Sequence, residues 1–198
     1  MLRKAIYPKI EALLNSAAKF LNEKGVTPNQ LTLAGLVLNF LAGWIYANGW
    51  VFFGGLMLLA AGLGDLLDGP VARVGGKSTP FGAFLDSTLD RYSDFFIFGG
   101  LALFYAKSAQ SGYFLITMGI ILGAYITSYS KARAENLMKH CNVGIFERAE
   151  RLIVLAFGSI IWPTLPFILW ILLIGTHATA IHRILYTRKI LLKGNEAE

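Results

Sequence analysis

Six long apolar segments leave little of this chain free to fold as a water-soluble domain. Of its 198 residues, 55% are hydrophobic and 15% are charged, a balance too apolar for an ordinary soluble protein of this size. About 20 mostly apolar residues form a helix long enough to cross the roughly 30 Å hydrocarbon core of a bilayer. We therefore predict an all-α integral membrane protein with one domain over residues 1–198 and six transmembrane helices at residues 31–48, 51–72, 82–106, 112–134, 148–165 and 167–188.

The connections between these segments carry turn-forming residues. Asn48-Gly49 and Gly75-Gly76 follow the first two segments, and polar stretches follow the third and the fourth. Residues 152–175 are almost continuously apolar, but Pro163 and Pro166 lie within them, and prolines so close together favour a turn over one long helix. The bundle is therefore predicted to occupy residues 31–188.

The first 26 residues differ from the rest, because apolar and basic positions alternate there at helical spacing. This pattern is typical of an amphipathic helix lying in the membrane interface, and a helix packed on a water-facing surface is the alternative. A cleavable signal peptide is not expected, since no basic region is followed by an apolar core.

Basic residues predict the orientation of the bundle. Nearly all Lys and Arg lie before the first segment, at residues 73–80, at residues 131–151 and at the C-terminal end, and the opposite connections hold only Lys107. The positive-inside rule then places both termini on the cytoplasmic side of the cytoplasmic (inner) membrane. This distribution explains the net charge of +6 without a nucleic-acid partner, and the single Cys141 excludes an internal disulfide.

Four carboxylates interrupt the apolar pattern. Asp65 and Asp68 lie near the end of the second segment, and Asp86 and Asp90 lie near the start of the third. Residues three or four apart share a helix face, and the glycines and prolines of residues 69–82 let the two helix ends approach closely. The four acids are therefore predicted to converge at the cytoplasmic edge of the membrane.

Unpaired carboxylates at this depth cost several kcal/mol each unless they are neutralised. An all-oxygen ligand set suits Mg²⁺ or Mn²⁺, and four acids can hold two such ions about 3.5–4 Å apart to activate a phosphate ester. An internal salt-bridge network and a proton or cation pathway, as in an ion-coupled transporter, are the alternatives. Gly69 and Gly82 leave room for a ligand, Arg73 is placed to bind a phosphate, and we expect Asp94 to orient Arg91.

The order and spacing of these residues resemble the signature of the CDP-alcohol phosphotransferase family. The sequence reads Asp65-x-x-Asp68-Gly69-x-x-Ala72-Arg73, then eight residues, then Gly82-x-x-x-Asp86-x-x-x-Asp90. The resemblance implies a CDP-linked donor, usually CDP-diacylglycerol, whose diphosphate is bound by two metal ions and whose lipid-side phosphorus is attacked by an alcohol, releasing CMP. It implies metal binding by Asp65, Asp68, Asp86 and Asp90 and general-base catalysis by Asp90. It also implies that the CDP donor is bound by Asp65 and Asp68 and by a nucleotide pocket that includes Gly69, Arg73 and Gly82. Asn29, before the first segment, is expected to contact the nucleotide or to cap the helix, and homodimers are common in the family.

A second set of basic residues lies close to the predicted level of the acids. The phrase KARAE…FERAERL resembles the segments that hold inositol phosphate in the phosphatidylinositol-phosphate synthase branch of the family, with Ala149 standing where that branch usually has proline. The expected acceptor-phosphate pocket comprises Ser128, Lys131, Arg133, Arg148, Arg151 and Arg183, with Arg188 as a second choice to Arg183. Ordinary membrane anchoring is the alternative role for these cations. The expected acceptor is inositol phosphate, and the alternative is glycerol 3-phosphate, which would yield phosphatidylglycerol phosphate.

Overall fold

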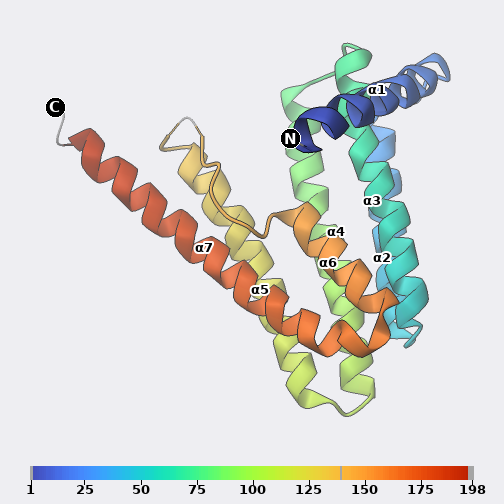
Figure 1. Cartoon of the computed structure of the whole chain (residues 1–198), viewed down its shortest axis with the longest axis vertical. Coiled ribbons are helices and arrows are strands. Elements are labelled where there is room, and N and C mark those ends of the chain that lie inside the picture. The colour runs from blue at the N-terminus through green and yellow to red at the C-terminus, as the bar shows by residue number, and fades with distance from the viewer. Residues whose placement is uncertain (1, 139, 196–198) are drawn as a thin grey trace.

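The structure, a computed structural model, describes the backbone of residues 2–138 and 140–195 and the side chains of residues 13–138 and 140–192. Within the described backbone every regular element is helical (Figure 1). The elements are α1 (Leu2–Glu23), α2 (Pro28–Ala47), α3 (Val51–Val74), α4 (Pro80–Lys107), α5 (Ser111–Glu135), α6 (Arg148–Ile160), the 3₁₀ turn η1 (Trp162–Thr164) and α7 (Leu165–Asn195).

Helices α2 to α7 lie where the six apolar segments predicted them, and the two largest differences are at the end of α7, which reaches Asn195 and not residue 188, and at the break between α6 and α7. Helix α6 already ends at Ile160, and η1 and α7 follow without a connection between the two prolines. Pro163 lies inside η1 and Pro166 lies in the first turn of α7, where a proline costs no backbone hydrogen bond. The connection between α6 and α7 therefore spans residues 161–164, two residues earlier than the predicted turn at residues 163–166.

Four of these helices are long and apolar enough to cross a membrane: Pro28–Ala47, Val51–Val74, Ser111–Glu135 and Trp162–Leu192. Helix α4 has 28 residues, or about 40 Å, but its first half carries Asp86, Asp90 and Asp94. Helix α6 has 13 residues, or about 20 Å, which is shorter than the hydrocarbon core. Several apolar helices therefore define an integral membrane protein.

Two groups of helices diverge from a common base. Helices α2, α3 and α4 pack together, α5 and α7 lean away from them, and α6 lies between α3 and α7 (Figure 1). The turns after α2 and α4 lie at one end with η1, and the α3–α4 loop lies at the other end, where α1 packs against α3. Tyr46, Phe98 and Leu155 are among the fully buried residues of the core.

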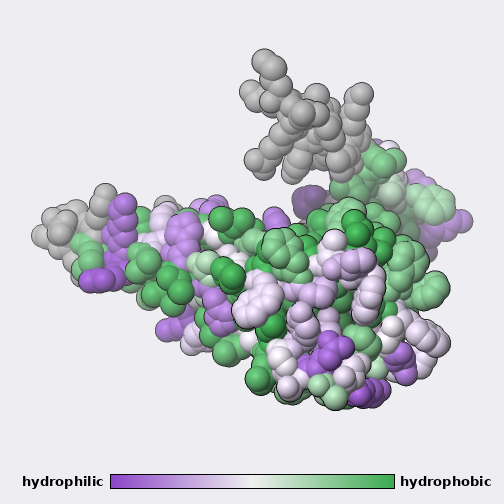
Figure 2. Space-filling model, turned by 60° about the horizontal axis from the view of Figure 1, so that its bottom comes forward, coloured by the Kyte–Doolittle hydropathy of each residue, from purple (hydrophilic) through white to green (hydrophobic). Residues whose placement is uncertain are grey.

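The outer surface of the bundle is apolar. Large hydrophobic side chains such as Phe53, Leu63, Leu115, Phe167 and Ile174 are more than half exposed, and Figure 2 shows hydrophobic residues over much of the visible face. In water such a surface would be unstable, whereas lipid chains cover it without cost. Helix α1 is confirmed as a helix, although the predicted apolar positions Leu2, Ile6 and Ile10 lie outside the described side chains.

Helices α2 and α4 approach closely at a pair of glycines, as small residues allow in membrane bundles. A Cβ on Gly43 would collide with the carbonyl oxygen of Phe96, and a Cβ on Gly100 would collide with the carbonyl oxygen of Gly43. Gly43→Ala is therefore expected to destabilise the bundle by about 1–3 kcal/mol, measured as a lower Tm in detergent. Gly112→Ala is the control, because nothing lies within 4 Å of its added Cβ; equal Tm values for the two variants would contradict the close approach.

Candidate active site

The four acids lie on the facing ends of two helices. Asp65 and Asp68 are in the last turns of α3, and a turn with Gly76 at φ +62° leads back toward α4, a conformation that glycine adopts readily. Helix α4 begins after Thr79, whose hydroxyl accepts a hydrogen bond from the backbone N–H of Gly82 and so caps the helix. This cap positions the first turns of α4, which carry the other two acids.

One arginine from a third helix joins the acids. The Nη1 atom of Arg148, the first residue of α6, lies 2.7 Å from Asp65 Oδ2 and 2.7 Å from Asp90 Oδ1. Asp68 Oδ1 instead accepts a hydrogen bond from the N–H of Gly69 at 2.5 Å. Two of the four carboxylates are thus paired with a guanidinium, and the predicted convergence of the acids is observed.

The carboxylates of the site supply the ligands that the predicted divalent cations need. Within the described residues no three His, Cys, Asp or Glu side chains are arranged to hold a metal ion as they stand, since Asp65 and Asp90 are turned to Arg148. All four carboxylates nevertheless line one cavity of about 430 Å³, whose other lining residues supply no nitrogen or sulfur ligand apart from the Arg148 cation. The chemistry of this donor set fits a hard, oxygen-preferring ion such as Mg²⁺ or Mn²⁺.

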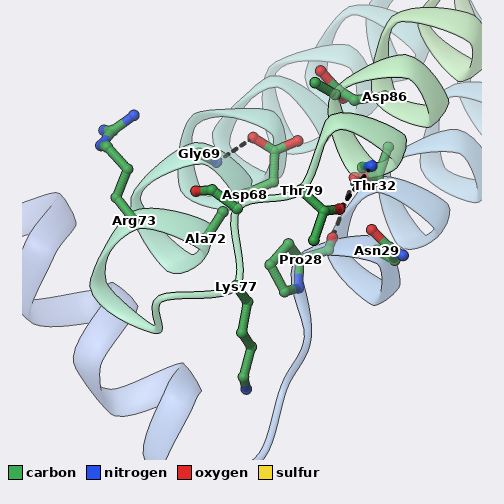
Figure 3. A pocket seen from close by; sticks show the side chains of 13 residues that line it. Pro28, Asn29, Thr32, Asp68, Gly69, Ala72, Arg73, Lys77, Thr79 and Asp86 are labelled. Atoms are coloured by element: carbon green, nitrogen blue, oxygen red, sulfur yellow. Dashed lines mark hydrogen bonds between the residues drawn. The ribbon is translucent and has the colours of Figure 1, made fainter.

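A second, smaller cavity of about 230 Å³ opens beside Asp68 and Asp86 (Figure 3). Its lining includes five of the six predicted donor-binding residues, which are Asn29, Asp68, Gly69, Arg73 and Gly82, together with Lys77. The sixth, Asp65, lines the 430 Å³ cavity instead. A Cβ on Gly82 would lie 3.1 Å from the Thr79 hydroxyl oxygen, so a larger residue would crowd both the helix cap and the cavity. Figure 3 shows Lys77 extending away from both carboxylates.

The 430 Å³ cavity has an apolar wall on its other side. Leucines of α3 and residues of α6 form it: Leu58, Leu59, Leu63, Leu66, Leu152 and Ile153. A cavity with carboxylates at one end and leucines along its length suits a molecule with a charged head and acyl chains.

A third cavity, of about 370 Å³, lies on the far side of Arg148 and contains most of the predicted acceptor residues. Its lining includes Ser128, Lys131, Arg148, Arg151 and Arg183, and also Glu147. Arg148 lines both this cavity and the one with the acids. Three cavities are therefore connected through shared lining residues: Asp68 and Asp86 line the first two, and Arg148 lines the last two.

The cations of the third cavity are paired with carboxylates. Glu147 Oε1 lies 3.2 Å from Lys131 Nζ and 2.6 Å from Arg183 Nη2. Arg151 is 1% exposed and donates to Asp94 Oδ2 at 2.7 Å. Arg183 and Arg151 are thus held rigidly at the cavity wall, and Glu147 stands where an anionic ligand would meet Lys131 and Arg183.

Two sequence predictions for this region differ from the structure. Arg133 is exposed and lines a separate cavity with Tyr129 and Leu137, because residues two apart on a helix point in different directions and Lys131 takes the inward position. Asp94 pairs with Arg151 and not with Arg91, whose guanidinium lies 3.4 Å from Asp90 Oδ2.

The sequence interpretation missed two residues next to the predicted site. Gly35 of α2 faces Asp65, and a Cβ there would lie 2.6 Å from Asp65 Oδ1. Glu147, directly before α6, pairs with Lys131 and Arg183 in the third cavity. Neither residue stands in a motif, and the only signal was the small size of Gly35 within an apolar helix.

The comparisons with known proteins agree with this arrangement. Residues 25–182 match the model of the CDP-alcohol phosphatidyltransferase family, a span that includes the whole signature and all the predicted acceptor residues except Arg183. The chain therefore belongs to the CDP-alcohol phosphatidyltransferase family, a family of transferases, as the signature indicated.

Two relatives are identical to this chain at about a third of the aligned positions. The chain is 35% identical to the phosphatidylinositol phosphate synthase of Streptomyces avermitilis over 204 residues, which cover 96% of this chain and 83% of the relative. It is 37% identical to the archaetidylinositol phosphate synthase of Pyrococcus horikoshii over 156 residues, which cover 78% of this chain and 80% of the relative.

Crystal structures of Mycobacterium tuberculosis phosphatidylinositol phosphate synthase have a similar fold. The one with CDP-DAG bound has a TM-score of 0.82 at 30% identity and covers 89% of this chain and 94% of the other. The one in complex with manganese and citrate has a TM-score of 0.80 at 32% identity and covers 88% of each chain.

Proposed function

We propose that this protein transfers a phosphatidyl group from CDP-diacylglycerol to inositol phosphate and releases CMP. The observation that carries the proposal is a set of three cavities that share lining residues: one with the nucleotide residues, one with carboxylates and an apolar wall, and one with cations. The names of the relatives and the CDP-DAG bound to the similar mycobacterial structure support the same reaction.

Each cavity has one role in the proposed reaction. The cytidine lies near Asn29, Gly69 and Gly82, and the acyl chains lie along the leucines of α3. Two divalent ions held by Asp65, Asp68, Asp86 and Asp90 neutralise the diphosphate and make its lipid-side phosphorus easier to attack. The manganese in the similar mycobacterial structure supports a divalent ion.

In the proposed reaction one bond to the lipid-side phosphorus forms and one breaks, and Asp90 takes the released proton. The acceptor hydroxyl gives its proton to Asp90, and its oxygen forms a bond to the lipid-side phosphorus. The bond from that phosphorus to the bridging oxygen breaks, and CMP leaves with the electron pair. Ser128, Lys131, Arg148, Arg151 and Arg183 form the wall at which the acceptor's phosphate is bound.

The orientation in the membrane is part of the proposal. The acid-bearing ends of α3 and α4 face the cytoplasm in an inner membrane. Helices α2 to α7 form six spans, and the short α6 starts below the membrane surface. Helix α1 lies in the membrane interface. The support is the positive-inside rule, because Lys107 is the only Lys or Arg in the connections at the opposite end of the bundle. Cysteine labelling from outside intact cells tests it: Ala109→Cys is expected to react, and Lys77→Cys is not.

A homodimer completes the proposal. An apolar cavity of about 510 Å³ is lined by residues of α2, α4 and α5, among them Phe40, Trp44, Phe95 and Leu103, and a second copy is the proposed neighbour. Light scattering with detergent correction is expected to give twice the mass of one chain, and a monomer would contradict the dimer without affecting the reaction.

The acceptor is tested with purified full-length protein, CDP-diacylglycerol and Mg²⁺. CMP release is expected with inositol phosphate, and unphosphorylated inositol is expected to support far less, because it leaves the cations of the third cavity without an anion. CMP release with glycerol 3-phosphate and none with inositol phosphate would overturn the choice of acceptor, and no CMP release with any alcohol would overturn the reaction.

A further inference from the structure

Arg148 stands between two sites that bind opposite charges. Its Nη1 atom lies 2.7 Å from one oxygen of Asp65 and from one oxygen of Asp90, on two different helices. The same side chain lines the cavity with Lys131 and Arg183. Divalent cations and Arg148 therefore need the same carboxylate oxygens, while a phosphate in the neighbouring cavity needs Arg148.

A second set of contacts gives the guanidinium another partner. Arg148 Nε and Asp94 Oδ1 are both buried and have no hydrogen-bond partner, and they lie 3.6 Å apart. Asp94 is 2% exposed, and its other oxygen is held by Arg151 at 2.7 Å. A small shift of Arg148 toward Asp94 would pair two buried polar atoms that are otherwise unsatisfied, which removes a cost of about 1–3 kcal/mol per group.

We propose that Arg148 couples the metal site to the acceptor pocket. It neutralises Asp65 and Asp90 until divalent cations take those oxygens, and its guanidinium then turns to Asp94 and to the phosphate of the acceptor. This inference rests on the proposed role of the four acids in metal binding. Because the two arrangements exclude each other, metal binding and phosphate binding assist each other reciprocally.

The first test is the affinity for Mn²⁺, measured by electron paramagnetic resonance on the purified full chain. Arg148→Gln removes the competing cation, so its Kd for Mn²⁺ is expected to fall about tenfold, within the usual range of coupling between sites. Arg133→Gln is the matched control, since Arg133 is exposed and outside the acceptor cavity, and it is expected to keep the wild-type Kd. An unchanged or weaker Mn²⁺ affinity of Arg148→Gln would overturn the proposal.

The second test is the coupling itself, with inorganic phosphate as the probe. The ratio of phosphate Kd values without and with Mn²⁺ is expected to be at least about fivefold larger in the wild type than in Arg148→Gln. Phosphate that binds only to the metal would give equal ratios and would overturn the coupling. Arg148→Lys replaces the glutamine variant if that variant does not fold, because lysine keeps the positive charge but has only one side-chain nitrogen. Its Mn²⁺ affinity is expected to rise above that of the wild type, but less than the affinity of Arg148→Gln.

A further variant separates this inference from the metal site itself. Asp86→Asn removes a proposed ligand that makes no ion pair with Arg148. If Asp86→Asn binds Mn²⁺ as the wild type does, the proposed metal site is wrong. If Asp86→Asn loses Mn²⁺ affinity while Arg148→Gln gains none, the metal site stands and only the coupling fails.

Discussion

Asp90→Asn is expected to lower turnover by about 10²- to 10⁴-fold, the usual contribution of a general base. The amide keeps the size of the side chain but cannot take the proton of the acceptor hydroxyl. Asp90 is placed for this role, because it lies on the wall of the central cavity next to Arg148, which also lines the acceptor cavity. The measurement is CMP release in a single turnover with CDP-diacylglycerol and inositol phosphate.

The controls for this variant separate catalysis from binding. Binding of the CDP-linked donor by Asp90→Asn is expected to stay close to the wild-type value, because Asp65, Asp68 and Asp86 are the proposed ligands that hold the donor's ions, whereas Asp90 completes the site beside Arg148, which lines the acceptor cavity. Glu150→Gln removes one negative charge from an exposed position on α6 and is expected to keep wild-type turnover. Normal turnover of Asp90→Asn would remove the general-base role.

The second large effect concerns the metal ions. Asp86→Asn is expected to reduce Mn²⁺ affinity by more than the 10- to 100-fold that is typical for loss of a residue that only supports a metal ligand. Turnover at low metal concentration is expected to fall to the background of the assay, because the diphosphate keeps its full negative charge. Metal titrations of turnover measure both effects in one experiment.

Metal concentration distinguishes this defect from the loss of the base. Excess Mn²⁺ is expected to restore part of the activity of Asp86→Asn and none of the activity of Asp90→Asn. EDTA is expected to stop turnover by the wild type, and added Mg²⁺ is expected to restore it. Full activity in EDTA would contradict two-metal catalysis.

Local signals in the sequence predicted most of the helices. At the start of α2, however, the cap is Thr27, which forms a capping box with Gln30, and not Asn29, which lines the nucleotide cavity. Pro28 occupies the first turn, where its missing N–H is not needed. The connection between α6 and α7 was harder to place, because prolines are the only turn signal within the apolar residues 152–175. A proline fits the first turn of a helix as well as a loop, so Pro166 did not mark the end of α6.

The acids were predictable because their arrangement follows from helix geometry. Asp65 and Asp68 share a face by their spacing, and a glycine turn brings them to Asp86. Arg148, by contrast, is 83 positions away from Asp65 along the chain. Its pairing depends on how α6 packs against α3, and no spacing rule predicts which carboxylates a distant arginine will reach.

The cations of the acceptor cavity show the same limit. Their presence near the acids was predictable from the basic residues on α5, α6 and α7. The carboxylate partners of these cations were not predictable. Glu147 reaches Lys131 and Arg183 because the segment before α6 packs against α7. Such pairs between distant segments require the packed structure.

Anomalous diffraction at the manganese edge, from crystals grown with CDP-diacylglycerol and Mn²⁺, locates the ions without reference to activity. The proposed mechanism predicts two peaks about 3.5–4 Å apart, each bound by oxygens of Asp65, Asp68, Asp86 or Asp90 and by the diphosphate. A saturated crystal with ordered donor and no peak among these carboxylates would contradict it.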